Sequence, residues 1–74
     1  MRITFDRQAD ALYIRLLEGD HECRVVRLSE DISLDFAVGE KLVGIEVLGA
    51  SRLFDKPGEP AIEVKDLVTR VVSA

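Results

Sequence analysis

The chain has 74 residues, a length that allows one domain because a split would leave neither half with a core of its own. Ten basic residues against 14 acidic ones give a formal charge of -4, which disfavours nucleic acid as a partner because non-specific affinity comes from neutralised phosphates. The apolar runs span only a few residues, so we expect no membrane segment, no signal peptide and a cytoplasmic protein.

A domain of this size gains only about 3 to 5 kcal/mol from its own core, and a disulfide, a metal or a partner subunit commonly supplements it. Cys23 is the single cysteine and cannot form an internal disulfide. His21 is the single histidine, which leaves too few soft ligands for a structural zinc site. We therefore predict no cofactor, no metal and a homodimer or higher homo-oligomer.

The first predicted element is a hairpin of residues 2–6 and 11–16, in which apolar and polar residues alternate with the period of a strand. The alternating apolar residues are Ile3, Phe5, Leu12 and Ile14. If Asp6 pairs with Ala11, all of them fall on one face. Asp6 and Asp10 then flank the turn, where carboxylates accept backbone N–H bonds.

A turn at residues 18–21 precedes a third predicted strand at about residues 23–28, which Arg24 and Arg27 interrupt. Those charges suit a sheet edge, because charged edge strands resist pairing with other chains. Together with the hairpin that follows, the pattern predicts an antiparallel β-meander of about five strands over residues 1–50.

The last two strands, between Ile32 and Val47, form the clearest hairpin of the sequence. Closing it around Gly39 and Glu40 brings every large apolar group to one face. The predicted pairs are Phe36 with Val43, Leu34 with Ile45, and Ile32 with Val47. Glycine at the first turn position suits a type II′ turn.

The C-terminal third has a different pattern. Residues 51–60 carry Gly, Pro and Ser and predict a loop, with one helical turn near Arg52. Residues 61–74 place apolar side chains at helical spacing and predict a C-terminal helix, although residues 61–64 also alternate like a short strand. The fold class predicted for residues 1–74 is therefore α+β.

The outer face of the predicted sheet is mixed rather than plainly polar, since it carries Tyr13, Leu17, Leu42 and Leu48 alongside Ser33, Asp35 and Glu46. Gly44 lies opposite Asp35 in the predicted register, and a glycine inside a strand indicates the close approach of another group. We interpret this as a site for a second layer. One face would take the C-terminal helix and the other a second subunit.

Several residues are candidates for ligand or interface contacts: Asp6, Asp10, Tyr13, Arg15, Asp35, Gly44 and Glu46. The carboxylates, together with Asp31, could bind a hard cation or act as acid and base, but their spacing matches no known cation loop, and turn capping is the favoured interpretation. Tyr13 and Arg15 share a face and could hold an anionic or aromatic ligand. We favour a different interpretation over ligand binding, in which Arg15 and the adjacent Arg2 form a salt bridge with Asp35 or Glu46.

His21 and Cys23 suggest a catalytic thiol with its base, since the two would share one side of a strand. No oxyanion-hole motif or third orienting group accompanies them. We favour a solvated turn histidine and a small buried cysteine, and we predict no catalytic residues.

Four segments together carry a resemblance to a known family: Ile3 to Asp6, Ala9 to Ile14, Ile32 to Phe36, and Leu42 to Ser51. The chain resembles the YuzE-like family of small bacterial and archaeal proteins, the domain of unknown function numbered 2283. The resemblance covers roughly the first two thirds and implies a mostly β domain without an established activity or site residues. The turn Ala37 to Glu40 departs from the acidic Asp-Gly turn common in the family, which weakens a cation-binding role for this loop.

The sequence thus favours a non-enzymatic, homo-oligomeric accessory or protein-interaction module, with an unidentified protein partner at its sheet edge or mixed face. The alternative is a small-ligand or metal-binding protein, or a weak hydrolase, that uses Asp6, Asp10, Tyr13 and Arg15. An antitoxin-like partner of a toxin fits the size and acidity but has no motif behind it.

Overall fold

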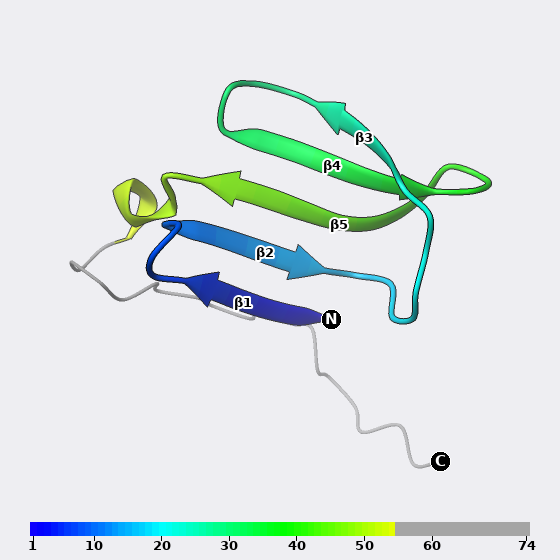
Figure 1. Cartoon of the computed structure of the whole chain (residues 1–74), viewed down its shortest axis with the longest axis horizontal. Coiled ribbons are helices and arrows are strands. Elements are labelled where there is room, and N and C mark those ends of the chain that lie inside the picture. Colours follow the sequence, from blue (N-terminus) through cyan, green and yellow to red (C-terminus); the bar gives the residue numbers. More distant parts are fainter. Residues whose placement is uncertain (55–74) are drawn as a thin grey trace, which may run out of the picture.

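The computed structural model describes residues 1–54, which form one antiparallel sheet of five strands and a short 3-10 helix (Figure 1). The elements are β1 (Arg2–Asp6), β2 (Ala11–Arg15), β3 (Arg24–Arg27), β4 (Ile32–Ala37), β5 (Lys41–Leu48) and η1 (Ala50–Leu53). The helix predicted at 61–74, on which the α+β class depends, lies outside the described residues. So does the alternative strand at 61–64.

The five strands do not form a meander, and this prediction was wrong. Their order is β1-β2-β5-β4-β3, so β5 inserts between β2 and β4, and β2 to β5 have the order of a Greek key (Figure 1). β5 is the longest strand and carries few charges, which suits the centre of a sheet. β3 has four residues, two of them arginines, and lies at an edge, where such charges resist pairing with another chain.

The predicted register of the first hairpin is confirmed, with Asp6 opposite Ala11 and Ile3 opposite Ile14. In the second hairpin, Leu34 opposite Ile45 and Ile32 opposite Val47 are confirmed as well. The prediction for Phe36 was wrong, because this residue lies opposite Leu42.

The shift at Phe36 comes from a β-bulge that leaves Val43 as the extra residue of β5. The Val43 carbonyl oxygen instead accepts bonds from the backbone N–H groups of Leu16 (2.7 Å) and Leu17 (3.1 Å), just beyond the end of β2. The turn also differs from the predicted type II′ turn. Both Gly39 (φ 84°) and Glu40 (φ 59°) have a left-handed backbone, whereas a type II′ turn has a positive φ only at the first of its two central positions.

The large apolar side chains gather on one face of the sheet, which we call the apolar face. It carries Ile3, Phe5, Leu12, Ile14, Val26, Ile32, Leu34, Phe36, Ile45 and Val47. These side chains are only half-buried, and Val43 and Ala50 are the fully buried hydrophobic residues of the described part. At the β1 edge, the ring of Phe54 packs edge-on against Phe5 with centroids 5.0 Å apart.

The described elements therefore form a single layer, with η1 at the end of β5 (Figure 1). Within residues 1–54, no helix is long and apolar enough to cross a membrane. The opposite face, which we call the polar face, carries the candidate groups Tyr13, Arg15, Asp35 and Glu46 around Gly44.

Val43 is 2% exposed, so we expect Val43→Ala to lower the free energy of unfolding by about 2 kcal/mol, through lost burial and a residual cavity. Val25→Ala is the matched control, because Val25 is 62% exposed and its loss should change stability by less than about 0.5 kcal/mol. Urea denaturation midpoints measure both. Equal effects of the two variants would contradict the burial of Val43 in the core.

Candidate functional site

The centre of the polar face is a bridge of three residues from three adjacent strands. Tyr13 on β2 reaches across β5 and donates a hydrogen bond from its hydroxyl to Asp35 Oδ2 on β4, at 2.8 Å. Gly44 of β5 lies between them, opposite Asp35 on one side and Arg15 on the other. We call this arrangement the Tyr13–Gly44–Asp35 bridge.

Glycine is required at position 44 because the tyrosine ring occupies the space of a side chain. A Cβ at this position would lie 2.9 Å from Tyr13 Cε2 and closer still to the hydroxyl oxygen. The prediction that another group approaches Gly44 is therefore correct, but that group is Tyr13 of the same chain. The structure thus removes the sequence argument for a second layer above Gly44.

The bridge favours the neutral form of the tyrosine. Burial, then the hydrogen bond to Asp35 and the negative charge of that carboxylate raise the pKa of Tyr13 to about 12 from its ordinary 10.0. A phenol with this pKa donates a hydrogen bond at neutral pH and is a weak proton acceptor. The geometry therefore fits a structural strut across the sheet better than a general base.

The two arginines of the first hairpin lie opposite one another, as predicted, but each is engaged elsewhere. Arg15 donates from Nε to the Leu17 carbonyl oxygen at 3.1 Å and from Nη2 to the Gly19 carbonyl oxygen, which fastens the connection between β2 and β3. Arg2 lies 3.5 Å from the carboxylate of Glu18 in an exposed ion pair. Neither of these contacts uses Asp35 or Glu46, the partners that the sequence suggested.

Glu46 lies in register between Tyr13 on β2 and Ser33 on β4, next to the bridge on the polar face. Its side chain is half-buried, and Ser33 is 8% exposed. The polar face thus brings together Tyr13, Gly44 and Asp35, with Glu46 and Arg15 at its margin.

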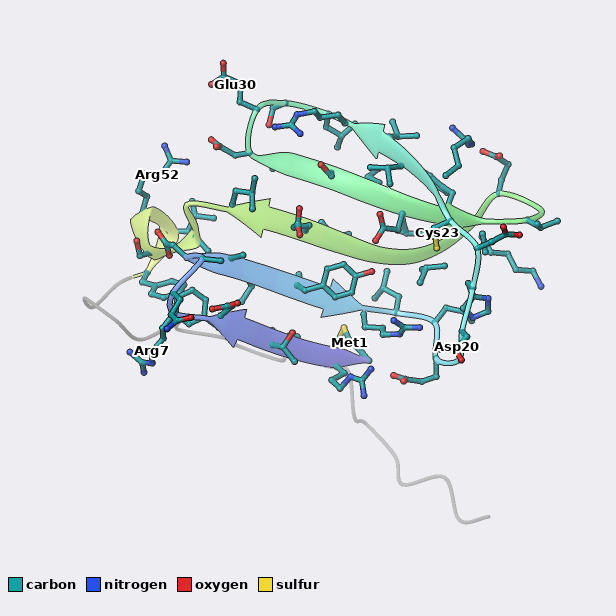
Figure 2. All side chains as sticks on the ribbon, in the orientation of Figure 1. Met1, Arg7, Asp20, Cys23, Glu30 and Arg52 are labelled. Carbon is teal, nitrogen blue, oxygen red and sulfur yellow. The ribbon has the colours of Figure 1, made fainter. Side chains whose placement is uncertain are left out.

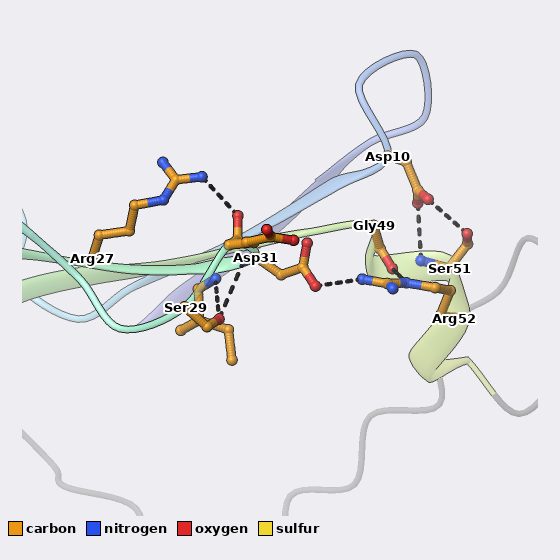
Figure 3. A network of polar contacts seen from close by, with 9 residues as sticks. Asp10, Arg27, Ser29, Asp31, Gly49, Ser51 and Arg52 are labelled. Carbon is orange, nitrogen blue, oxygen red and sulfur yellow. Dashed lines mark hydrogen bonds and ion pairs between the residues drawn. The ribbon is translucent and has the colours of Figure 1, made fainter.

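A second cluster lies where β5 ends, and Figure 3 shows its contacts. The Asp10 carboxylate accepts hydrogen bonds from the Ser51 backbone N–H (2.9 Å) and from the Ser51 hydroxyl (2.7 Å). The Asp10 carbonyl oxygen also accepts a bond from the N–H of Ala50, which is fully buried. These three bonds hold Asp10 with a left-handed backbone (φ 50°) and attach the first turn to η1.

The turn between β3 and β4 reaches the same cluster through an ion pair. Arg52 Nη2 donates to Asp31 Oδ2 at 2.7 Å (Figure 3), a bond that raises the pKa of Arg52. The Asp31 carbonyl oxygen accepts from the Leu48 N–H. Ser29 accepts from the backbone N–H groups of Asp31 and Ile32, as in a capped turn.

Sequence reasoning missed Ser29, Ser51 and Arg52 as members of this cluster. Ser29 before Glu30 and Asp31 is a turn signal that could have been recognised. The pairing of Asp10 with Ser51 crosses 41 positions of sequence and left no local pattern.

The remaining candidate carboxylate, Asp6, caps its own turn by accepting the N–H groups of Gln8 (3.0 Å) and Ala9 (3.2 Å) on Oδ1. Asp6 and Asp10 lie at one end of β2 and Arg15 at the other, about 16 Å along the strand. Among residues 1–54, no three His, Cys, Asp or Glu side chains are grouped to hold a metal ion.

Cys23 is exposed, so the prediction of a buried cysteine was wrong. It lies on the connection that enters β3 (Figure 2), and its thiol contacts the His21 carbonyl oxygen at 3.5 Å. The His21 ring bonds through Nε2 to the Glu18 carbonyl oxygen at 2.7 Å, as a turn histidine would. The thiol and the imidazole are not hydrogen-bonded to one another.

The structure defines a small antiparallel β protein whose polar groups are mostly engaged within the chain. Among known families, the one described as "Protein of unknown function (DUF2283)" matches residues 2–51, which include all five strands. The chain belongs to this family, also called YuzE-like, as its motifs predicted. No curated protein and no solved structure matches the chain.

Tyr13 is the single tyrosine and the chain has no tryptophan, so tyrosinate absorbance reports on the bridge alone. We expect an apparent pKa near 12, and a lower value in Asp35→Asn, which removes the carboxylate charge but leaves the burial. Glu46→Gln on the same face is the control and should leave the pKa of Tyr13 unchanged.

The same shift makes stability depend on pH, because the raised pKa means that the folded state holds the proton more tightly than the unfolded one. The contribution of Tyr13 is complete below pH 10 and is lost as the pH rises towards about 12. The free energy of unfolding should therefore fall over this range more in the natural chain than in Tyr13→Phe. Parallel curves for the two proteins would contradict the hydrogen-bonded bridge.

Asp10→Ala should destabilise the protein by about 2 kcal/mol, because it removes both bonds to Ser51 and strains the left-handed backbone. Asp10→Asn retains an acceptor and tolerates this backbone, so we expect about half the loss. Urea denaturation measures the stabilities, and the NMR shift of the Ser51 amide proton reports the bond directly. An unchanged Ser51 shift in Asp10→Ala would rule out the contact.

Proposed function

We propose that this protein is a non-enzymatic interaction module whose copies associate through the sheet into a homo-oligomer. The observation that carries the proposal is the single layer formed by residues 1–54, whose apolar face is only half-buried. A sheet with one apolar face ordinarily buries it against a second layer. The composition predicts the cytoplasm as the compartment in which the module acts.

The engaged state of the polar groups also supports an interaction role over an enzymatic one. Tyr13 and Asp35 bond to each other, Arg15 fastens a loop, and the turn carboxylates cap backbone N–H groups. A catalytic or ligand site needs polar groups that converge on a substrate. The alternative of a ligand-binding protein or weak hydrolase is weaker, because Asp10 and Arg15 lie at opposite ends of β2.

Light scattering coupled to size-exclusion chromatography tests the proposal on the full chain. We expect a mass greater than that of one chain at micromolar concentration, with a proportion of oligomer that rises with concentration. A mass equal to one chain across the whole concentration series would contradict the proposed function.

A further inference from the structure

The edges of the sheet differ in what they offer to a second chain. In the part of the chain that the structure describes, β1 and β3 are the two edges (Figure 1). An edge strand presents backbone N–H and C=O groups that another strand can continue. β1 has five residues, no proline and no bulge, and within residues 1–54 it pairs with β2 alone.

Symmetry restricts how β1 can pair with itself. A two-fold axis perpendicular to the sheet keeps each side chain on its own face, and residues opposed across antiparallel strands also share a face. Only registers that oppose residues of the same face are therefore open to a symmetric pair. For β1, the register centred on Thr4 meets this condition and uses all five residues.

In this register the side chains of β1 are complementary to those of the second copy. Arg2 lies opposite Asp6 of the second copy, and the pair occurs twice because of the symmetry. Ile3 lies opposite Phe5 of the second copy, which extends the apolar face across the junction. Opposed unlike charges and apolar pairs both stabilise neighbouring strands.

Resting on the proposed oligomer, we infer that two copies join through β1, antiparallel and centred on Thr4, into one continuous sheet. The contacts that Arg2 and Asp6 already make within the chain are compatible with this pairing. Asp6 uses Oδ1 for its turn, and among residues 1–54 this leaves Oδ2 able to accept a bond from Arg2 of the second copy. The exposed pair of Arg2 with Glu18, at 3.5 Å, is of the kind that contributes little and can exchange its partner.

The β3 edge lacks this complementarity. Under the same symmetry rule, Arg24 falls opposite Val26 or Arg27 falls opposite Val25, so charge meets an aliphatic group in either register. The arginines are also engaged: Arg24 pairs with Glu40 at 2.5 Å and lies 5.3 Å from the Phe36 ring centre, and Arg27 bonds to the Glu30 carbonyl oxygen. β1 is therefore the edge that fits a second copy.

The test is a charge exchange between copies, followed by sedimentation velocity over a concentration series. Arg2→Glu opposes like charges twice, as does Asp6→Lys, so we expect each variant alone to self-associate about tenfold more weakly. An equimolar mixture of the two variants forms a heterodimer with both pairs attractive and should recover the natural affinity. Because Asp6→Lys still lacks its turn cap in the mixture, recovery cannot come from restored folding.

Arg7→Glu is the matched control, since it makes the same change of charge in the turn beyond β1 (Figure 2) and should leave self-association unchanged. A dimer that is insensitive to Arg2→Glu would overturn the inference and leave the proposed function standing. The inference would also be overturned if Val26→Lys on the apolar face disrupts the dimer while Arg2→Glu leaves it intact. A natural chain that is monomeric throughout would overturn both.

Discussion

The insertion of β5 between β2 and β4 is the constraint on which the rest of this structure depends. It gives the longest strand two neighbours, and it places Gly44 beneath Tyr13 and between Arg15 and Asp35. It also brings the end of β5 beside the first turn, so that η1 can attach to Asp10. The bridge on the polar face and the cluster at η1 are both consequences of this one strand order.

Most of the polar groups that attract attention in the sequence hold this arrangement together. Tyr13 and Asp35 connect β2 to β4 over the central strand, Arg52 connects η1 to Asp31, and Arg15 fastens the long connection to β3. With so little fully buried apolar surface among residues 1–54, the sheet depends on such contacts to define a single strand order. The surfaces left over, the apolar face and the β1 edge, are those through which we propose that the protein associates.

Local patterns predicted the hairpins well because strand alternation and turn residues lie within a few positions of one another. The pairing of Asp6 with Ala11 and the close approach to Gly44 both follow from such patterns. The strand order does not, because no local signal distinguishes β3 from β5 as the neighbour of β2. The occupant of the space above Gly44 could not be identified for the same reason, since Tyr13 is adjacent to it only when β2 pairs with β5. The bulge at Val43 depends on bonds to Leu16 and Leu17 from that same pairing.

The position of β5 also has a consequence for how the chain folds. The hairpins β1–β2, β3–β4 and β4–β5 join residues that are close in sequence, whereas Ala11 and Leu48, which face each other across β2 and β5, are 37 positions apart. Closing so long a loop costs chain entropy before the contacts can compensate for it. The two parts, β1–β2 and β3–β5, are therefore expected to form first and to meet at the β2–β5 seam in the rate-limiting step, with the contact between Asp10 and Ser51 securing one end of that seam.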